Sequence, residues 1–186
     1  MQTVNAGSLY RYSAFTRRPE GGNPAGVWIG DTLPSPETMQ QIAAEVGFSE
    51  TAFVTPASGL ERTVRYYSPA IEVSFCGHAT IATGVVLGER EGDGTYRLAT
   101  AVGEVPVSVR TRDGFREAAL TSVAPEFAPA PDALVDEALA ALGWRIDQLD
   151  ASIPPARAYA GAWHLVLAVS EASRLAMLDY DFDRLK

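Results

Sequence analysis

The feature that most constrains the fold is a helix-forming segment that is apolar on nearly every side. The run from residue 78 to residue 89 contains small and aliphatic residues all round its circumference: Ala79, Ile81, Ala82, Val85, Val86 and Leu87. A surface helix keeps one polar face, so a helix of this kind is stable only when other elements surround it. We therefore expect a buried central helix. It would begin at a turn through Gly77, directly after the short strand candidate Val73-Ser74-Phe75.

Short runs rich in β-branched and aromatic residues lie on both sides of this helix, separated by turn-forming residues. The expected strands are residues 9–15, 23–29, 51–55, 62–67, 96–99, 105–110 and 116–121. A second helix is expected from Pro36 to Val46, because Ser35 can cap its start and Gly47 can end it. The first part of the chain therefore mixes strands and helices.

A Pro/Ala-rich connector at residues 125–131 divides the chain. We place the boundary so that residues 1–128 form a first domain and residues 129–186 begin a second one. The second stretch offers a helix at 132–142, a strand at 162–169 and a short terminal helix at 171–178. Three such elements cannot enclose a hydrophobic core alone, so we expect this second domain to be incomplete.

The charge of the chain excludes several kinds of partner. Its formal charge is −8 at pH 7, from 15 basic and 23 acidic residues, and no cluster of Lys or Arg reverses this sign locally. Such a surface repels phosphate backbones and anionic lipids, which argues against nucleic acid and membrane as partners. The sequence lacks a secretory signal and an apolar run that could span a bilayer. Cys76 is the single cysteine, so the expected location is the reducing cytoplasm.

Glu50 is the first candidate for chemistry. It lies in Ser49-Glu50-Thr51-Ala52-Phe53, at the junction between a helix end and an apolar strand. In an apolar cleft, desolvation disfavours the charged carboxylate, so one group can both donate and accept a proton near neutral pH. The alternative is a solvated carboxylate at the start of a strand, which is the commoner situation for Glu. The residue pattern alone leaves both interpretations open.

The second candidate is Cys76-Gly77-His78-Ala79-Thr80, where a strand turns into the start of the buried helix. Unpaired N–H groups and the positive end of the helix dipole would point at one place, which suits a small anion such as a carboxylate. Gly77 would let the ligand approach the backbone, and His78 would offer a donor or proton relay. The alternative is that His78 is a helix cap or a packed residue.

Cys76 has two interpretations as well. A thiol at a helix start could be a nucleophile or the base of a two-cysteine racemase, yet the chain has no second cysteine. Inert core packing is the alternative. A Cys-x-His pair in a chain with two histidines gives no regular metal-ligand set, so we expect no metal. We expect His164, beside Trp163, to be structural.

Asn23-Pro24-Ala25-Gly26 could line a pocket, although turn formation also explains these residues. The sequence contains neither a Gly-x-x-x-x-Gly-Lys loop nor a Gly-x-Gly-x-x-Gly fingerprint, so nucleotide and nicotinamide cofactors lack support. Taken in order, three motifs nevertheless resemble the PhzF family of phenazine biosynthesis. They are Gly22-Asn23-Pro24-Ala25-Gly26-Val27, then residues 39–45 running into Ser49-Glu50-Thr51-Ala52-Phe53, then Cys76-Gly77-His78-Ala79-Thr80. The resemblance extends from about residue 10 to residue 103.

This resemblance implies a diaminopimelate-epimerase-like α+β fold. Each of two similar domains would be a curved, mainly antiparallel sheet wrapped around a central helix, with the active site between them. It also implies that Glu50 moves a proton between carbons of a small carboxylate substrate, assisted by His78, with neither metal nor organic cofactor. The expected substrate-binding residues are Asn23, Ser49, Cys76, Gly77, Ala79 and Thr80.

The chain also departs from the family pattern. Related proteins continue into a full second domain that supplies an aspartate and a Gly-Ser turn, and neither is found before Lys186. We therefore expect either a homo-oligomer such as a dimer or a second chain that completes the cleft. The leading interpretation is a cofactor-independent isomerase of biosynthesis or secondary metabolism. The alternatives are a truncated, non-catalytic anion-binding or scaffold protein and a cysteine-based amino-acid racemase or epimerase.

Overall fold

The computed structural model describes residues 2–4, 6–18 and 20–185, the first three of them by their backbone only. It divides into two compact units between Val123 and Ala124. The domain boundary expected between residues 128 and 129 stays a prediction. In the structure, strand β10 (Glu126–Pro129) lies across that position and belongs to the second unit. Each unit is described by itself.

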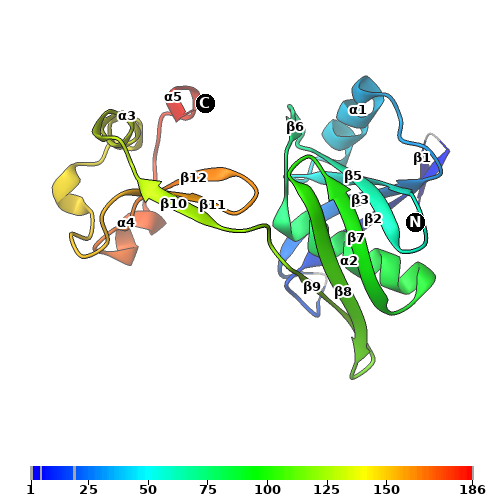
Figure 1. Ribbon diagram of the computed structural model, residues 1–186. Helices are drawn as coiled ribbons and strands as arrows, with labels where there is room; N and C mark the ends of the chain where they lie inside the picture. The colour runs from blue at the N-terminus through cyan, green and yellow to red at the C-terminus, as the bar shows by residue number, and fades with distance from the viewer. Residues whose placement is uncertain (1, 5, 19, 186) are drawn as a thin grey trace. The chain divides into compact units, whose positions relative to one another are not determined.

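The described residues of the first unit form one large sheet and two helices (Figure 1). The strands are β1 (Gln2–Val4), β2 (Gly7–Ala14), β3 (Asn23–Gly30), β4 (Thr51–Pro56), β5 (Glu61–Tyr67), β6 (Glu72–Val73), β7 (Gly94–Thr100), β8 (Gly103–Arg112) and β9 (Phe115–Leu120). The helices are α1 (Pro36–Val46) and α2 (Gly77–Glu91). All seven strands expected in this part of the chain are therefore present.

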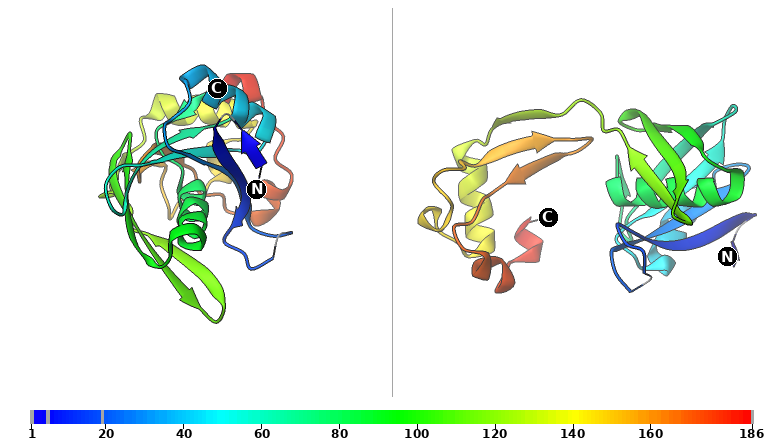
Figure 2. Two further views of the ribbon diagram at one scale, coloured as in Figure 1. Left: turned by 90° about the vertical axis from the view of Figure 1, so that its right-hand side faces the viewer. Right: turned by 90° about the horizontal axis from the view of Figure 1, so that it is seen from below.

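The strands follow the order β1-β2-β3-β4-β5-β7-β8-β9, with β6 paired to β5. The pairs β3–β4 and β5–β7 are parallel, and the others are antiparallel. The sheet curls strongly, and α2 lies inside the curve (Figure 2). The buried faces of α2 and of the surrounding strands share one hydrophobic cluster, which includes Val27, Val54, Val86, Leu87 and Val107. The predicted buried central helix is therefore confirmed.

Helix α1 covers the other side of the sheet. It begins as its sequence predicts, because Ser35 Oγ accepts the N–H of Thr38 at 3.3 Å. It ends at Gly47, which has the left-handed φ of 71° that glycine tolerates best. Its apolar side packs in a second cluster with Trp28 and Phe53 from the sheet. Helix α1 thus fixes the direction from which the chain enters β4.

Close packing holds α2 against the sheet. Gly84 faces β8 and β9, and a Cβ at this position would lie 2.7 Å from Val107 Cγ1 and 2.9 Å from Ala118 Cβ. Gly88 approaches Val109 in the same way, with 2.4 Å to its Cγ1. These two glycines therefore let the helix backbone lie directly on the strands. Residues with side chains would push it away.

The second unit contains a three-stranded sheet in the order β10-β11-β12 and several short helices. Its elements are β10 (Glu126–Pro129), α3 (Asp132–Leu142), the 3₁₀ turn Ile146–Gln148, β11 (Ala156–Tyr159), β12 (Trp163–Val166), α4 (Ala172–Ala176) and α5 (Phe182–Leu185). The connector expected at residues 125–131 is partly wrong, because residues 126–129 pair with β11. Pro129 is tolerated there since β10 is an edge strand.

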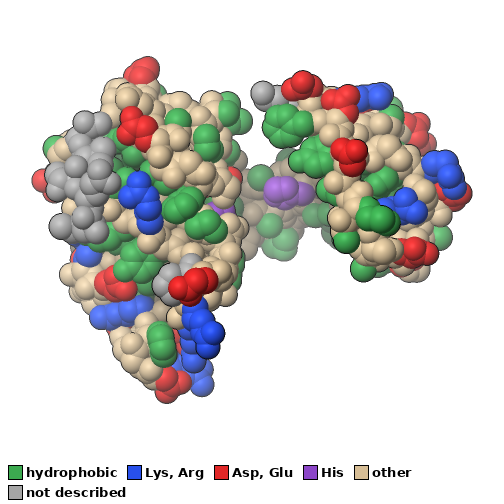
Figure 3. Space-filling view, turned by 180° about the vertical axis from the view of Figure 1, so that it is seen from behind, with side chains coloured by type: hydrophobic (Ala, Val, Ile, Leu, Met, Phe, Trp, Pro, Cys, Tyr) green, Lys and Arg blue, Asp and Glu red, His purple; other side chains and the backbone are tan. Residues whose placement is uncertain are grey.

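The second unit has a small core and an exposed apolar surface. Val135, Leu139 and Leu149 form its buried cluster. Large apolar side chains remain at its surface (Figure 3). The exposed fractions of Phe127, Trp163, Met177 and Phe182 are between 50% and 84%. The predicted strand at 162–169 is shorter than expected, and the terminal helix spans five residues only. In the described part of the chain, no helix is long and apolar enough to cross a membrane.

Gly84→Ala should destabilise the protein. Alanine is favoured over glycine in a helix by about 1 kcal/mol, but the added methyl group meets Ala118 Cβ, which is fixed to the backbone. We expect a net loss of about 1 to 3 kcal/mol from this overpacking, measured by urea denaturation. Gly77→Ala is the matched control in the same helix, because its Cβ would meet nothing within 4 Å. Equal stability of Gly84→Ala and the control would contradict the close packing.

Candidate active site

Three side chains that are distant in sequence meet where α2 begins. Glu50 directly precedes β4, and its backbone carbonyl accepts the N–H of Gly26 at 3.1 Å, which ties it to the start of the parallel strand β3. Cys76 is the residue that caps α2, and His78 lies in the first turn of this helix. Because α2 runs inside the curved sheet, its first turn lies beside the start of β4. The topology therefore brings the two candidate constellations of the sequence together.

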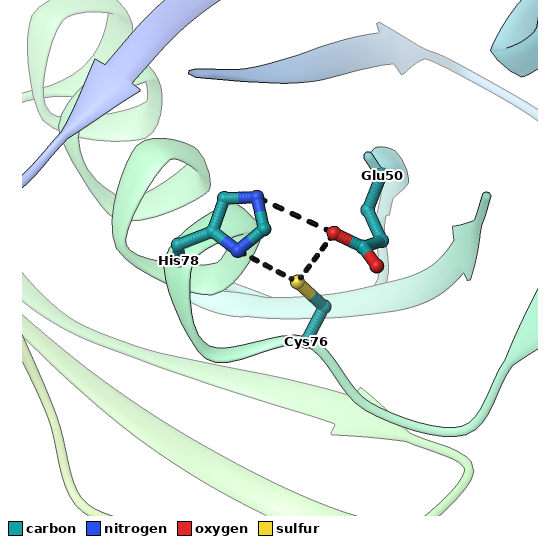
Figure 4. Close-up of side chains that lie close together, drawn as sticks. All are labelled: Glu50, Cys76 and His78. Atoms are coloured by element: carbon teal, nitrogen blue, oxygen red, sulfur yellow. Dashed lines mark hydrogen bonds and ion pairs between the residues drawn. The ribbon is translucent and has the colours of Figure 1, made fainter. Parts of the chain in front are cut away.

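The side chains of Glu50, Cys76 and His78 form a closed triangle of contacts (Figure 4). His78 Nε2 lies 3.4 Å from Glu50 Oε2, and His78 Nδ1 lies 3.2 Å from Cys76 Sγ. Cys76 Sγ lies 3.5 Å from Glu50 Oε2. Ser49 adds a fourth contact, with its Oγ 3.3 Å from His78 Nε2. The site therefore combines a carboxylate, an imidazole, a thiol and a hydroxyl.

The triangle is partly sheltered from solvent. The side chain of Glu50 is 22% exposed and that of His78 is 11% exposed, so each remains accessible to a small molecule. Cys76 is 9% exposed. Burial raises the pKa of the Cys76 thiol to about 12, and the nearby Glu50 carboxylate adds to this rise, while the backbone N–H groups of Ala79 and His78 oppose it. At neutral pH the sulfur is therefore a protonated thiol.

The start of α2 has space above its backbone. A Cβ at Gly77 would meet nothing within 4 Å, so a ligand could approach the helix terminus there. The first turn has no acidic side chain, and no side chain caps it by a hydrogen bond. Such a helix start favours an anion through its dipole and free N–H groups. This geometry fits the predicted carboxylate-binding role of Gly77.

The remaining expected binding residues differ in how they can contribute. Ala79 and Thr80 are fully buried, so only their backbone groups could meet a ligand. Asn23 is exposed at the first position of β3, at the same end of the parallel pair β3–β4 as Glu50, and no contact joins it to the triangle. His164 lies in β12, which belongs to the second unit.

Two supporting features were missed by the sequence reasoning. Gly26 has no room for a side chain, because a Cβ would lie 2.5 Å from Thr51 Oγ1 beside Glu50. Thr80 Oγ1 donates to the carbonyl of Cys76 at 2.7 Å and lies 2.6 Å from Tyr66 OH, inside the core. Both features hold the backbone on which the triangle rests. Their signal in the sequence is weak, since glycine and threonine also have many unrelated uses.

The three donor atoms also raise the question of a metal ion, since donor atoms of Glu50, Cys76 and His78 lie within 4.8 Å of one another. Within the described residues, however, the two nitrogens of His78 face different partners, and one cation could bind only one of them. A cation would have to displace the hydrogen bonds of the triangle, so the arrangement favours proton chemistry.

A large groove of about 1070 Å³ runs along α2 in the first unit, between β2 and the hairpin β8–β9. Ile81, Ala82 and Val85 line it on the helix side. Several of its charged side chains have partners, for example Glu89 with Tyr12 and Arg110 with Glu117. None of the three triangle residues lines the groove. The triangle and the groove are therefore separate features of the first unit.

Fold and site together define a class of protein in which a carboxylate, a thiol and an imidazole meet at the start of a helix inside a curved sheet. The model of the PhzC-PhzF family, described as phenazine biosynthesis-like protein, matches residues 12–186. The chain therefore belongs to this family. The expected diaminopimelate-epimerase-like fold is confirmed by a crystal structure of the PhzF family phenazine biosynthesis protein of Bacillus anthracis. That structure has a TM-score of 0.75 and 30% identity, and the match covers 93% of this chain and 59% of the other.

Two relatives from Pseudomonas aeruginosa are named as isomerases. An uncharacterized isomerase is 38% identical over 181 residues, which cover 96% of this chain and 63% of the relative. Trans-2,3-dihydro-3-hydroxyanthranilate isomerase is 33% identical over 110 residues, which cover 57% of this chain and 40% of that protein. The chain spans 42%, 58% and 63% of the length of three curated relatives.

The thiol of Cys76 should react slowly with iodoacetamide. The thiolate is the reactive form, and a pKa of about 12 leaves little of it at pH 8. We expect alkylation on the order of 10² to 10³ times slower than that of a free cysteine, with a rate that still rises above pH 10. Because Cys76 is the single cysteine, the label reports on this position alone. Rapid labelling with an apparent pKa below 9 would instead support a cysteine-based racemase.

Proposed function

We propose that the protein acts as a cofactor-independent isomerase in which Glu50 moves a proton on a small carboxylate substrate. The observation that carries this proposal is the position of Glu50. Its carboxylate is partly exposed, contacts the imidazole of His78, and lies beside the open start of α2. An acid or base must be reachable by substrate and held in place by neighbours, and Glu50 meets both conditions.

In this proposal each residue of the site has its own role in binding or proton transfer. The free N–H groups at the start of α2 and the open space over Gly77 bind the substrate carboxylate. The Glu50 carboxylate removes a proton from one carbon of the bound substrate and returns it to another. His78 keeps a hydrogen bond to Glu50, and Ser49 contacts the substrate or orients His78. Asn23 would approach the substrate from the start of β3.

The substrate class follows from chemistry and from one relative. A helix terminus with open space suits a compact anion, and proton transfer between carbons requires an acidified C–H bond. The relative named trans-2,3-dihydro-3-hydroxyanthranilate isomerase has a cyclic amino acid in its name, and such a carboxylate would fit this site. We infer a role in biosynthesis or secondary metabolism, in the cytoplasm.

A cysteine-based racemase is a weaker second candidate. Cys76 does lie at the start of α2, where a catalytic thiol would be expected. Its burial, however, raises its pKa to about 12, which opposes the thiolate that such an enzyme needs. The other candidate is a protein that binds a small anion without turnover. This would keep the helix terminus as the ligand site and leave Glu50 without a catalytic task.

We also propose that another polypeptide, either a second chain or another copy of this one, covers the apolar surface of the second unit. Large apolar side chains of this unit support the proposal, because Phe127 and Met177 are 84% and 75% exposed. Exposed apolar patches of this kind are typical of surfaces that are covered by a partner.

Glu50→Gln should lower turnover by about 10² or more, because the amide keeps the shape of the side chain and cannot carry the proton. The assay would follow conversion of trans-2,3-dihydro-3-hydroxyanthranilate by the native assembly, together with deuterium incorporation from D₂O. Glu45→Gln is the matched control, since Glu45 is an exposed residue of α1 that contacts Gln41. Full activity of Glu50→Gln would exclude Glu50 as the acid–base residue.

Native mass spectrometry of the assembly should show more than one polypeptide. A mass above 19.9 kDa, the mass of this chain, is expected because the apolar surface of the second unit needs a cover. Denaturation then separates the two possibilities, since a homodimer gives one mass and a second chain gives two. A stable monomer that binds anthranilate-type carboxylates without turnover would favour the binding protein.

A further inference from the structure

The imidazole of His78 faces a different partner with each ring nitrogen (Figure 4). Nδ1 lies 3.2 Å from Cys76 Sγ. Nε2 lies 3.4 Å from Glu50 Oε2 and 3.3 Å from Ser49 Oγ. A neutral imidazole carries one N–H, so one nitrogen donates a hydrogen bond while the other accepts one. The partners on the two sides therefore decide where the ring proton lies.

On the Nε2 side the partner is a carboxylate. When it is ionised, Glu50 can only accept hydrogen bonds, so a lone pair on Nε2 would face the lone pairs of Oε2. An N–H on Nε2 turns this contact into a charge-assisted hydrogen bond. The hydroxyl of Ser49 fits either tautomer, because it can donate or accept. The carboxylate is therefore the partner that selects a donor at Nε2.

On the Nδ1 side the partner is a thiol that keeps its proton, because burial raises the pKa of Cys76. One S–H can serve one acceptor. Glu50 Oε2 lies 3.5 Å from the sulfur, farther than His78 Nδ1 at 3.2 Å, and it already faces Nε2. The thiol can instead donate to Glu50, with Nδ1–H facing the sulfur and Ser49 donating to Nε2. Donation from the S–H to Nδ1 uses the shorter of the two sulfur contacts and leaves the carboxylate to accept the stronger donor, Nε2–H.

We propose that Cys76 is a positioning residue: by donating its S–H to Nδ1, it holds His78 as the Nε2–H tautomer with the ring proton directed at Glu50. Its value for catalysis rests on the proposed function. The tautomer keeps a donor at the carboxylate while Glu50 exchanges a proton with the substrate carbon. It also removes the free lone pair through which His78 could take that proton from Glu50. The thiol itself exchanges no proton with the substrate.

Nitrogen NMR tests the tautomer directly. The chain contains two histidines, so a ¹⁵N-labelled sample gives two sets of ring signals, and His164→Gln assigns them. At about pH 8.5, two units above the unperturbed imidazole pKa, we expect His78 to show a protonated Nε2 and an unprotonated Nδ1. A His78 ring protonated on Nδ1, alone or together with Nε2, would overturn the proposal. His164 is the internal reference.

Three variants then test the part played by the thiol. Cys76→Ala removes the donor and should shift His78 toward a mixture of tautomers. Cys76→Ser keeps a donor and should restore the Nε2–H form. Ser49→Ala removes a contact of Nε2 only, so it should leave the tautomer unchanged. An unchanged tautomer in Cys76→Ala would show that the thiol does not set it. The wild-type spectrum remains decisive even if a variant fails to fold.

Kinetics separate this inference from the proposed function. If both hold, Cys76→Ala should lower kcat about 10-fold or more, with partial recovery in Cys76→Ser and little change in KM, as for other residues that fix a catalytic imidazole. If Glu50→Gln keeps full activity, the proposed function fails while the NMR result still stands. If the tautomer follows Cys76 but kcat does not, the thiol orients His78 without a catalytic effect.

Discussion

The enclosure of α2 by the curved sheet is the constraint on which the rest of the first unit depends. An apolar helix such as this one must be covered over most of its surface, and strands from β2 to β9 provide the cover except along the groove lined by Ile81, Ala82 and Val85. Gly84 and Gly88 allow this cover to be close. Since the sheet follows the helix around, the start of β4 lies beside the start of α2, where Glu50 contacts Cys76 and His78. The meeting of these three side chains is a consequence of how the core is packed.

The same packing holds the chemistry in place. The hydroxyl of Tyr66 on β5 contacts the hydroxyl of Thr80, and Thr80 donates a hydrogen bond to the carbonyl of Cys76. These two hydrogen bonds connect the turn before α2 to strand β5. Gly26 on β3 bonds the carbonyl of Glu50 from the other side. The backbone carbonyls of Glu50 and Cys76, the residues that carry the carboxylate and the thiol, are therefore both held by hydrogen bonds. Side chains held in this way lose little conformational freedom when a ligand binds.

Much of this could be predicted from the sequence where the pattern is local. The apolar helix, the capped helix α1 and the strands of the first unit each carry a strong local signal, such as Ser35 before Pro36 or Gly47 after Val46. The second unit was harder, because β10 and β11 are short strands that are stable only when paired with each other. Pro125 and Pro129 predict a connector from the local sequence. Residues 126–129 form an edge strand because they pair with β11, which the local sequence does not show.

The site shows the same division between local and long-range information. Glu50 and Cys76-Gly77-His78 were recognisable as separate motifs, but their contact joins residues that are 26 positions apart in the sequence. Sequence alone also left three groups that could exchange a proton. The structure separates two of them: burial raises the pKa of the Cys76 thiol to about 12, so the sulfur keeps its proton, whereas the Glu50 side chain is 22% exposed. A protonated thiol can then serve as a donor to the imidazole. In this family member, the cysteine that suggests a nucleophile is better suited to orient the neighbouring histidine.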